Sequence, residues 1–403
     1  MQVFSDMNKD PYQRPLVAEI KQAFGQDLPF LHVITGPRQS GKTTAASQAA
    51  ATWKGETVFA AADAPLPPGP EWIHSQWANA LSRCSAGRGV LLVLDEVQKV
   101  RGWSEVVKLL WDKEQREHKG IKVLLLGSST LLMQKGLSDS LTGRFITHRC
   151  NHWGFAEMRR AFGWDLDEWV FFGGYPGAAR LKGDEASWRG YVTDSLIDTV
   201  LSRDILQLAT VAKPALLRHL FGLAVSHPAE IFSYNKMLGQ LQDAGNTTTL
   251  AHYLRLLETA FLISGLDSYR SGRGRKRAGS PKLVFWNNAL VTAYLGSGFK
   301  QTRQDLPWWG RLVENAAGAH LLNGLDRLTY QIHYWRDRND EVDFVVRSPR
   351  KTWAVEVKSG RDRPGRGLAA FLRDNPKAHP FIVGHSGLPL EDFFLTDPAT
   401  IFD

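Results

Sequence analysis

One eight-residue segment constrains the fold more than any other part of the chain. It fits the pattern G-x-x-x-x-G-K-T and follows a short apolar run, Leu31–Thr35. Glycines at both ends let backbone N–H groups surround a phosphate chain, and the following helix adds the partial positive charge of its N-terminus. The lysine reaches the β- and γ-phosphates, and the threonine hydroxyl reaches Mg²⁺. The segment predicts a nucleotide phosphate site made of Gly36, Pro37, Arg38, Gln39, Ser40, Gly41, Lys42, Thr43 and Thr44.

Two further apolar runs predict a parallel sheet around this loop. Residues 89–94 read GVLLVL and end at Asp95 and Glu96, whereas residues 122–126 read KVLLL and end at Gly127 and Ser128. Continuous apolar runs separated by helical patterns favour strands that are buried on both faces. Ligands of such sheets bind at the carboxyl ends of the strands. We therefore expect an α/β domain with its site at that edge, and a chance glycine turn becomes a weak alternative.

Polar residues beside these strands supply the candidate catalytic groups. Asp95 is placed to hold the Mg²⁺ shell, and Glu96 to polarise the attacking water. Ser128 could orient the same water, or it could be an ordinary loop serine. Arg144 is a candidate arginine finger, a group that neutralises transition-state charge and often comes from a neighbouring subunit; a structural salt bridge is the alternative. A finger requires subunits to meet, so homo-oligomers are expected, at least transiently.

The middle of the chain is predicted to be helical. Residues 185–208 have apolar side chains at helical spacing, and two shorter helices are expected at 234–242 and 247–258. Strand-like runs at 261–263 and 282–286 then flank a basic, glycine-rich tip. This order is typical of a winged helix, whose second helix enters the major groove of DNA; a flexible basic linker is the alternative. The candidate DNA-binding residues are Arg270, Arg273, Arg275, Lys276 and Arg277.

A second constellation lies near the C-terminus. Asp343, followed by Glu356 and Lys358, resembles the D…(E)-x-K signature of PD-(D/E)xK nucleases. Adjacent strands would bring the two carboxylates together, and period-two alternation puts Glu356 and Lys358 on one face. Two carboxylates can hold Mg²⁺, and the lysine can orient water or stabilise phosphate charge. Glu314, on a preceding helix, adds another acid. Ordinary charge alternation on an edge strand is the alternative, and a nuclease fold can also serve only to bind DNA or a partner.

Together these segments resemble a known family. The chain is similar to prokaryotic AAA+-type ATPases of the archaeal-ATPase group that carry a C-terminal restriction-endonuclease-like domain. The resemblance spans roughly residues 10 to 384 and is carried by residues 13–16 (QRPL), 36–44 (GPRQSGKTT), 94–98 (LDEVQ), 126–129 (LGSS), 141–144 (LTGR), 173–176 (GGYP), 202–205 (SRDI) and 253–258 (YLRLLE), with the acidic positions near the C-terminus. It implies a winged-helix middle segment. The chain departs from the family at Asn288, where an aspartate is usual.

Composition narrows the class of protein. The net charge is +8, which favours nucleic acid or anionic membranes as partners, although a solvated surface with a mild basic excess is the alternative. Two cysteines, Cys84 and Cys150, cannot staple a chain of 403 residues, so a reducing compartment is expected. No stretch approaches the ~20 apolar residues of a membrane span, and the first ten residues lack a signal-peptide core. A cytoplasmic location is therefore expected.

These observations predict three domains: a P-loop AAA+-type ATPase domain at 1–165, a helical and winged-helix domain at 166–286, and a nuclease-like α/β domain at 287–403. The function expected is a Mg²⁺-dependent ATPase that couples ATP binding and hydrolysis to the binding or remodelling of duplex or branched DNA. ATP and Mg²⁺ are the expected cofactors, with metal ligands from Thr43, Asp95, Asp343 and Glu356. Two alternatives remain open: an ATP-regulated, metal-dependent DNA nuclease, and a nucleotide-gated switch that binds a protein partner in defence or toxin control.

Overall fold

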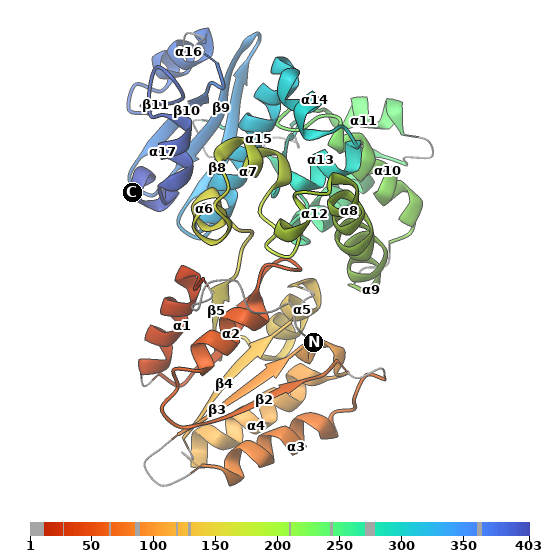
Figure 1. The fold of residues 1–403 in the computed structure, drawn as a ribbon, viewed down its shortest axis with the longest axis vertical. Helices are drawn as coiled ribbons and strands as arrows, with labels where there is room; N and C mark the ends of the chain where they lie inside the picture. Colours follow the sequence, from red (N-terminus) through yellow and green to blue (C-terminus); the bar gives the residue numbers. More distant parts are fainter. Residues whose placement is uncertain are drawn as a thin grey trace. The chain divides into compact units, whose positions relative to one another are not determined.

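The computed structural model describes residues 12–26, 28–63, 66–84, 89–117, 120–127, 130–208, 211–241, 245–270, 279–360 and 365–403. The chain divides into two compact units, Met1–Asn151 and His152–Asp403 (Figure 1). The predicted boundaries were 165 and 286; here the helical segment and the C-terminal α/β segment fall in one unit. Within the described ranges, no helix has both the length and the apolar character needed to cross a membrane.

The first unit is built on a five-stranded parallel sheet in the order β2-β3-β4-β1-β5. Its strands are β1 (Leu31–Thr35), β2 (Glu56–Ala61), β3 (Val90–Asp95), β4 (Ile121–Leu126) and β5 (Phe145–Arg149). The three apolar runs of the sequence are β1, β3 and β4, and every residue of β1 and β3 is buried. The predicted parallel sheet is thus confirmed. In the sheet, β4 lies between β1, which leads into the phosphate loop, and β3, which ends at Asp95.

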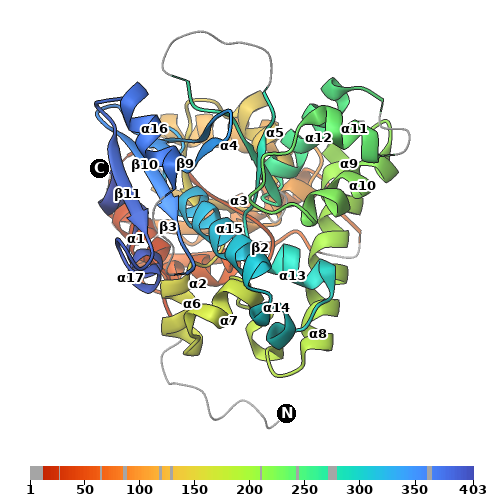
Figure 2. The ribbon, with the colours of Figure 1, turned by 90° about the horizontal axis from the view of Figure 1, so that it is seen from above.

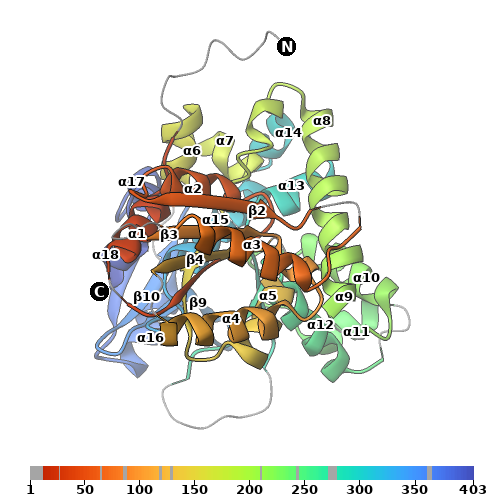
Figure 3. The same ribbon diagram turned by 90° about the horizontal axis from the view of Figure 1, so that it is seen from below.

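Helices cover both faces of this sheet (Figure 3). Side chains of α1 (Pro15–Gly25) and α2 (Lys42–Ala50) pack on one face, and those of α3 (Glu71–Ser82), α4 (Trp103–Glu117) and α5 (Thr130–Ser140) pack on the other. A 3₁₀ turn, η1 (Val97–Lys99), follows β3. The buried residues of α2 include Ala45, Ala46 and Ala49. Alanine lets the helix backbone approach the sheet closely, which fixes the helix N-terminus at the end of β1.

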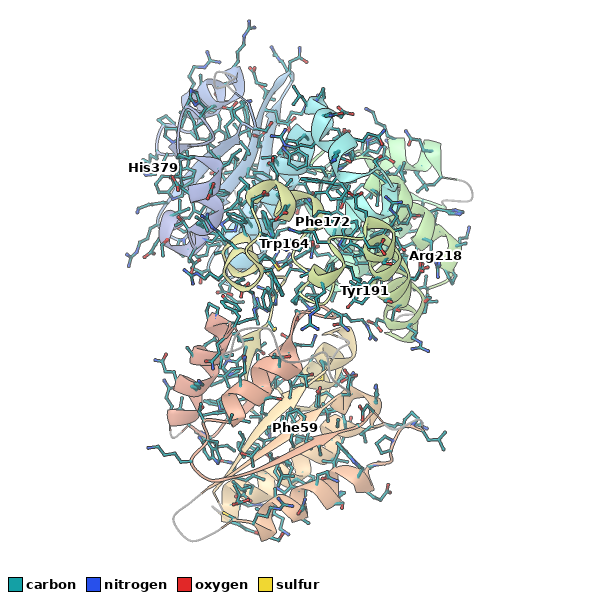
Figure 4. The ribbon with its side chains drawn as sticks, in the orientation of Figure 1. Phe59, Trp164, Phe172, Tyr191, Arg218 and His379 are labelled. Carbon is teal, nitrogen blue, oxygen red and sulfur yellow. The ribbon has the colours of Figure 1, made fainter. Side chains whose placement is uncertain are left out.

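The second unit begins with a helical layer. The predicted helix at 185–208 is confirmed as one run of α8 (Glu185–Gly190), η3 (Tyr191–Asp198), η4 (Val200–Asp204) and α9 (Ile205–Leu208), in which η3 and η4 are π-helical. The other helices of the layer are α6 (Phe155–Phe162), α7 (Leu166–Phe172), η2 (Ala179–Leu181), α10 (Pro214–Val225), α13 (Ala289–Leu295) and α14 (Phe299–Gln304). Aromatic rings pack among them: Trp164 meets Phe172 with ring centroids 5.9 Å apart (Figure 4).

A helix pair and a hairpin follow in the predicted order. They are α11 (Tyr234–Gln240), α12 (Thr247–Thr259), β6 (Ile263–Leu266) and β7 (Lys282–Phe285), and the two strands pair antiparallel. After β6 the chain joins the edge of the next sheet, because Ser268 bridges Tyr334 and the Tyr269 N–H donates to the Tyr334 carbonyl at 2.6 Å. The predicted tip, with Arg273, Arg275, Lys276 and Arg277, lies outside the described residues.

The C-terminal sheet has the order β11-β10-β9-β8. Its strands are β8 (Gln331–Asp337), β9 (Asp340–Arg347), β10 (Thr352–Val357) and β11 (His379–Val383); β8, β9 and β10 are antiparallel, whereas β11 runs parallel to β10. Helix α16 (Arg366–Asp374) packs on one face, and α15 (Leu306–Gly324) lies against the other, where Gly318 meets Phe344 (Figure 2). Two short helices, α17 (Leu390–Leu395) and α18 (Pro398–Phe402), complete the unit. The adjacent strands that the sequence predicts around Asp343 and Glu356 are β9 and β10, which pair antiparallel.

Candidate functional site

Two glycines shape the loop between β1 and α2. A Cβ on Gly36 would lie only 2.0 Å from the carbonyl oxygen of Cys150, so no side chain fits there. Gly41 has φ +89° and caps α2, a left-handed conformation that glycine adopts without strain. The backbone can therefore curl tightly in front of the helix N-terminus, as phosphate binding requires.

The Lys42 ammonium is held by its own loop. It donates to the carbonyl oxygens of Gly36 at 3.1 Å and Pro37 at 2.6 Å, and the residue is 7% exposed. Among the described residues, no carboxylate lies within ion-pair distance of it. Burial lowers the pKa of Lys42, and the charges of Glu96 and Asp95, neither of which pairs with the ammonium directly, offset this effect only in part. A bound phosphate would supply the missing negative charge, so this loop fits a nucleoside triphosphate.

Thr43 and Asp95 meet across the end of the sheet. The Thr43 hydroxyl donates to Asp95 Oδ2 at 2.7 Å, and the Glu96 N–H donates to Asp95 Oδ1 at 2.8 Å. Hydroxyl and carboxylate oxygens are the ligands that Mg²⁺ prefers, so the pair fits that ion. Thr44 is exposed on the next position of α2, and Gln39 and Arg38 lie at the loop surface. The structure thus brings the predicted loop and the predicted aspartate together.

Glu96 is fixed by a neighbour that the sequence reasoning missed. Gln98 Nε2 donates to Glu96 Oε2 at 2.8 Å, and Lys99 lies 3.6 Å from the same oxygen. Glu96 itself has φ +54°, which is strained for a residue with a side chain. Strain of this kind often accompanies a functional position. The available signal was the spacing, since a glutamine two residues after the acid can reach back to it.

A second missed residue anchors the loop from outside. Arg14 Nη1 donates to the Ser40 carbonyl at 2.9 Å, to the Asn151 carbonyl at 3.0 Å and to Cys150 Sγ at 3.1 Å. Cys150 is fully buried, and its sulfur also lies 3.4 Å from the Ser40 hydroxyl. These contacts tie the start of α1 and the end of β5 to the loop.

The remaining predicted residues of the first unit differ in outcome. Ser128 lies outside the described residues. Arg144 forms a two-pronged ion pair with Asp112, with Nε–Oδ1 and Nη2–Oδ2 distances of 2.7 and 3.1 Å. The hydrogen bond and the charge of Arg144 lower the pKa of Asp112. This is the salt bridge that the sequence left open as an alternative, and the finger role stays a prediction.

The four residues predicted for the C-terminal site gather at one place: Glu314 of α15, Asp343 of β9, Glu356 of β10, and Lys358 directly after β10. Val355 pairs with Phe344, so Glu356 and Asp343 follow at the next step of β10 and β9. The Val357 N–H donates to Asp343 Oδ2 at 2.8 Å, and Lys358 Nζ lies 2.9 Å from Glu356 Oε1. Oxygens of Glu314, Glu341 and Asp343 lie within 4.8 Å of one another, a spacing that could hold a metal ion.

The electrostatics of this cluster are unusual. Burial raises the pKa of Asp343 to about 7, and the negative charge of Glu314 contributes. Burial lowers the pKa of Lys358, but its hydrogen bond to Glu356 and the charge of that carboxylate outweigh this effect and leave the pKa raised. A carboxylate with a shifted pKa, such as that of Asp343, beside a fixed lysine is typical of functional sites.

Two members of the cluster were missed from sequence. Lys282, the first residue of β7, has a fully buried side chain and lies 2.6 Å from Glu314 Oε1 and 3.1 Å from Glu341 Oε1. Glu341 was detectable, because it stands two residues before Asp343 and so shares its face of the strand. Lys282 gave no such signal, since it is 59 residues away from Glu341 in the chain.

Asn288, the departure from the family, has a structural role. Its amide nitrogen donates to the carbonyl oxygens of Val170 at 2.8 Å and Leu312 at 2.9 Å, and its oxygen accepts from Asn315 at 2.7 Å. The residue is 4% exposed. An ionised aspartate has no N–H and could donate neither of these two hydrogen bonds, so asparagine suits this position.

Only part of the predicted DNA-binding surface is described. Arg270 is exposed directly after the Ser268 bridge. On α12, the exposed residues Thr248, His252 and Arg255 follow one another at spacings of four and three, and therefore lie on one face of the helix.

Comparison with known proteins agrees with this geometry for the first unit. Residues 30–159 match an AAA domain family, whereas residues 163–301 and 309–392 match two families described as domains of unknown function, DUF8612 and DUF4143. An uncharacterized protein of Mycobacterium tuberculosis is 27% identical over 91% of this chain and 79% of its own length. An uncharacterized protein of Haemophilus influenzae is 23% identical over 82% of this chain and 83% of its own length.

Two solved structures are distantly similar. A Walker-type ATPase of Pyrococcus abyssi has a TM-score of 0.45 at 13% identity, covering 72% of this chain and 99% of its own. The Aeropyrum pernix ORC1 protein, solved in complex with DNA, has a TM-score of 0.32 at 13% identity, covering 74% of this chain and 97% of its own. At these low TM-scores, the assignment rests on the family match and on the loop geometry. Residues 30–159 therefore form an AAA domain, with a phosphate loop that fits a nucleoside triphosphate.

Proposed function

We propose that the protein is a Mg²⁺-dependent ATPase that acts on DNA. The observation that carries the ATPase part is the buried Lys42 ammonium, which has no carboxylate partner among the described residues, beside the 2.7 Å contact between Thr43 and Asp95. Bound Mg²⁺ would neutralise phosphate charge in the transition state. Lys42 would hold the β- and γ-phosphates, and Thr43 and Asp95 would hold the ion. Glu96, fixed by Gln98, would accept a proton from the attacking water.

The DNA part rests on the second unit. The order α11, α12, β6, β7 is that of a winged helix, with the Thr248, His252 and Arg255 face of α12 available for the major groove. The net charge of +8 favours a polyanionic partner. ATP binding and hydrolysis would then alter how the second unit grips duplex or branched DNA. We further propose that subunits associate while they act.

The test is an ATPase assay with single-stranded, duplex and branched DNA. We expect one of these to stimulate turnover, and we expect Lys42→Ala to abolish it without loss of DNA binding. Arg255→Ala should weaken DNA binding while basal turnover stays unchanged. Binding should also weaken steeply with salt. If no DNA binds at low salt and none stimulates turnover, the DNA part fails, and the alternative of a nucleotide-gated switch for a protein partner gains support.

A second candidate, an ATP-regulated nuclease, is favoured by the meeting of Asp343, Glu356 and Lys358 at neighbouring strands. Two carboxylates would hold a divalent cation there, and Lys358 would stabilise phosphate charge. DNA should be incubated with Mg²⁺ or Mn²⁺, with and without ATP. Cleavage that disappears in Asp343→Ala and in Lys358→Ala supports this candidate, whereas equal cleavage by these variants indicates a contaminating nuclease.

A further inference from the structure

Lys282 is a buried cation inside the acidic cluster. Its side chain is 0% exposed, and its ammonium contacts carboxylates from two different elements, Glu314 of α15 at 2.6 Å and Glu341 of β9 at 3.1 Å. It also lies 5.1 Å from the centre of the Phe344 ring. A lysine is seldom fully buried unless it is paired. These two short N–O distances show that the charged ammonium, and not only the aliphatic stem, belongs to the site.

The pairing divides the cluster into two halves. Glu314, Glu341 and Asp343 have oxygens close enough for one metal ion, but two of these three carboxylates already bind the Lys282 ammonium. A divalent cation at this point would compete with a fixed positive charge a few ångströms away. The half made by Glu314 and Glu341 is therefore already filled by a cation of the chain itself.

The other half is not filled. Glu356 is 4% exposed; its Oε1 accepts from Lys358 at 2.9 Å and from the Gly365 N–H, whereas its Oε2 is buried and has no hydrogen-bond partner among the described residues. A buried carboxylate oxygen without a partner is costly. Asp343 stands at the next position of the neighbouring strand, and its side chain is half-buried.

Charge counting agrees with this division. The cluster holds four carboxylates, from Glu314, Glu341, Asp343 and Glu356, and two ammonium groups, from Lys282 and Lys358. With all six groups ionised, two negative charges are uncompensated, which one divalent cation would balance.

We propose that Lys282 acts as a built-in cation that fills the Glu314 and Glu341 half, so that the cluster takes one divalent metal ion, at Asp343 and Glu356, and not two. Lys282 is thus a positioning residue, since it holds two carboxylates away from the metal. Because it comes from β7, the β6–β7 hairpin forms part of the metal site. The inference rests on the proposed metal-binding role of Asp343 and Glu356, but it is independent of ATP hydrolysis and of DNA cleavage.

The test is to count bound Mn²⁺ on the full chain without nucleotide, from the electron paramagnetic resonance signal of the free ion. We expect the wild type to bind one ion. Lys282→Met removes the charge but keeps most of the stem, so it should bind a second ion, whereas Lys282→Arg keeps the charge and should bind one. Asp95→Asn is the control for the nucleotide loop and should also bind one.

A second pair of variants keeps the test valid if Lys282→Met does not fold. Glu341→Gln should retain the single ion with little change in affinity, whereas Asp343→Asn should weaken its binding at least about tenfold. Equal loss in both variants would mean that Glu341 is a metal ligand, and it would overturn the inference, as would two ions in the wild type. If the wild type binds no ion at all, the proposed metal site itself fails.

Discussion

The Thr43 hydroxyl donates a hydrogen bond of 2.7 Å to the Asp95 carboxylate, and this contact joins the start of α2 to the end of β3. The two residues are 52 positions apart in the chain, yet both lie at the carboxyl edge of the sheet. With a nucleotide bound, the same two oxygens could both bind one Mg²⁺ ion, because they already lie side by side.

Replacing either oxygen should disable hydrolysis. We expect Thr43→Val to lower the ATPase rate at least about 100-fold, because a metal ion contributes several kcal/mol of charge stabilisation in the transition state. Asp95→Asn should have a similar effect. Steady-state ATPase rates over a range of Mg²⁺ concentrations measure this, with Thr43→Ser as the control that retains the hydroxyl and the activity. A normal Mg²⁺ dependence in Thr43→Val would remove this residue from the metal site.

Glu96 and Gln98 should separate binding from hydrolysis. Glu96→Gln should still bind ATP but should turn it over about 10²- to 10⁴-fold more slowly, the range expected for loss of a general base. Gln98→Leu removes one hydrogen bond to that carboxylate and should cost about 5- to 10-fold in rate. Fluorescent nucleotide binding and kcat should be measured side by side. Equal rates in Gln98→Leu and the wild type would show that the glutamine does not position Glu96.

A structural salt bridge and an arginine finger at Arg144 predict different effects of its loss on the ATPase rate. Its guanidinium is held in two places by Asp112 of its own chain, so we expect Arg144→Ala to keep most of the ATPase activity and to lower thermal stability as Asp112→Ala does. Loss of an arginine finger would instead cost about 10³-fold or more in kcat. A loss of that size in Arg144→Ala alone, with Asp112→Ala still active at high protein concentration, would establish the finger.

The parts of the site that sequence predicted are the local ones. The loop from Gly36 to Thr43 and the acid pair after β3 are patterns within a few residues, and their chemistry requires those residue types at that spacing. Arg14 reaches Cys150 across 136 positions, and Lys282 reaches Glu341 across 59, so neither contact leaves a local pattern. Such contacts depend on how helices and hairpins pack against a sheet.

The same distinction holds for the fold. Continuous apolar runs predicted β1, β3 and β4, because parallel strands are buried on both faces. Strand β2, in which only Val58 is buried and the other residues are exposed or half-buried, gave no such run. The π-helical turns η3 and η4 were also beyond prediction, since their apolar spacing resembles that of an α-helix.

A negative charge in place of the Asn288 amide should destabilise the second unit. Asn288→Asp would replace two donated hydrogen bonds by contacts between a carboxylate and two carbonyl oxygens, those of Val170 and Leu312. An uncompensated buried charge costs about 3–5 kcal/mol, so we expect the free energy of unfolding to fall by roughly that amount. Chemical denaturation measures it. Asn339→Asp is the matched control, because Asn339 is exposed in the turn between β8 and β9 and the charge change is the same.

A buried histidine pair in the first unit should make its stability depend on pH. His148 Nδ1 lies 2.7 Å from Glu19 Oε1, and His148 Nε2 lies 3.1 Å from His32 Nδ1. His32 Nε2 is buried without a hydrogen-bond partner among the described residues. Burial lowers the pKa of His32 from 6.5 to about 4, and the nearby His148 and Lys122 add to this effect. The folded protein therefore holds His32 neutral at neutral pH.

The sign follows from proton counts. Between pH 6.5 and pH 4, the imidazole of His32 is protonated in the unfolded chain but not in the folded chain. The contribution of neutral His32 to the free energy of unfolding is therefore complete above pH 6.5 and decreases as the pH falls toward 4. From pH 7.5 to pH 5, His32 should account for a loss of roughly 2 kcal/mol. His32→Leu replaces the imidazole on β1 with an apolar side chain and so removes the titrating group. Urea unfolding at both pH values should therefore show a smaller pH dependence in this variant, and an undiminished dependence would show that His32 does not titrate in this way.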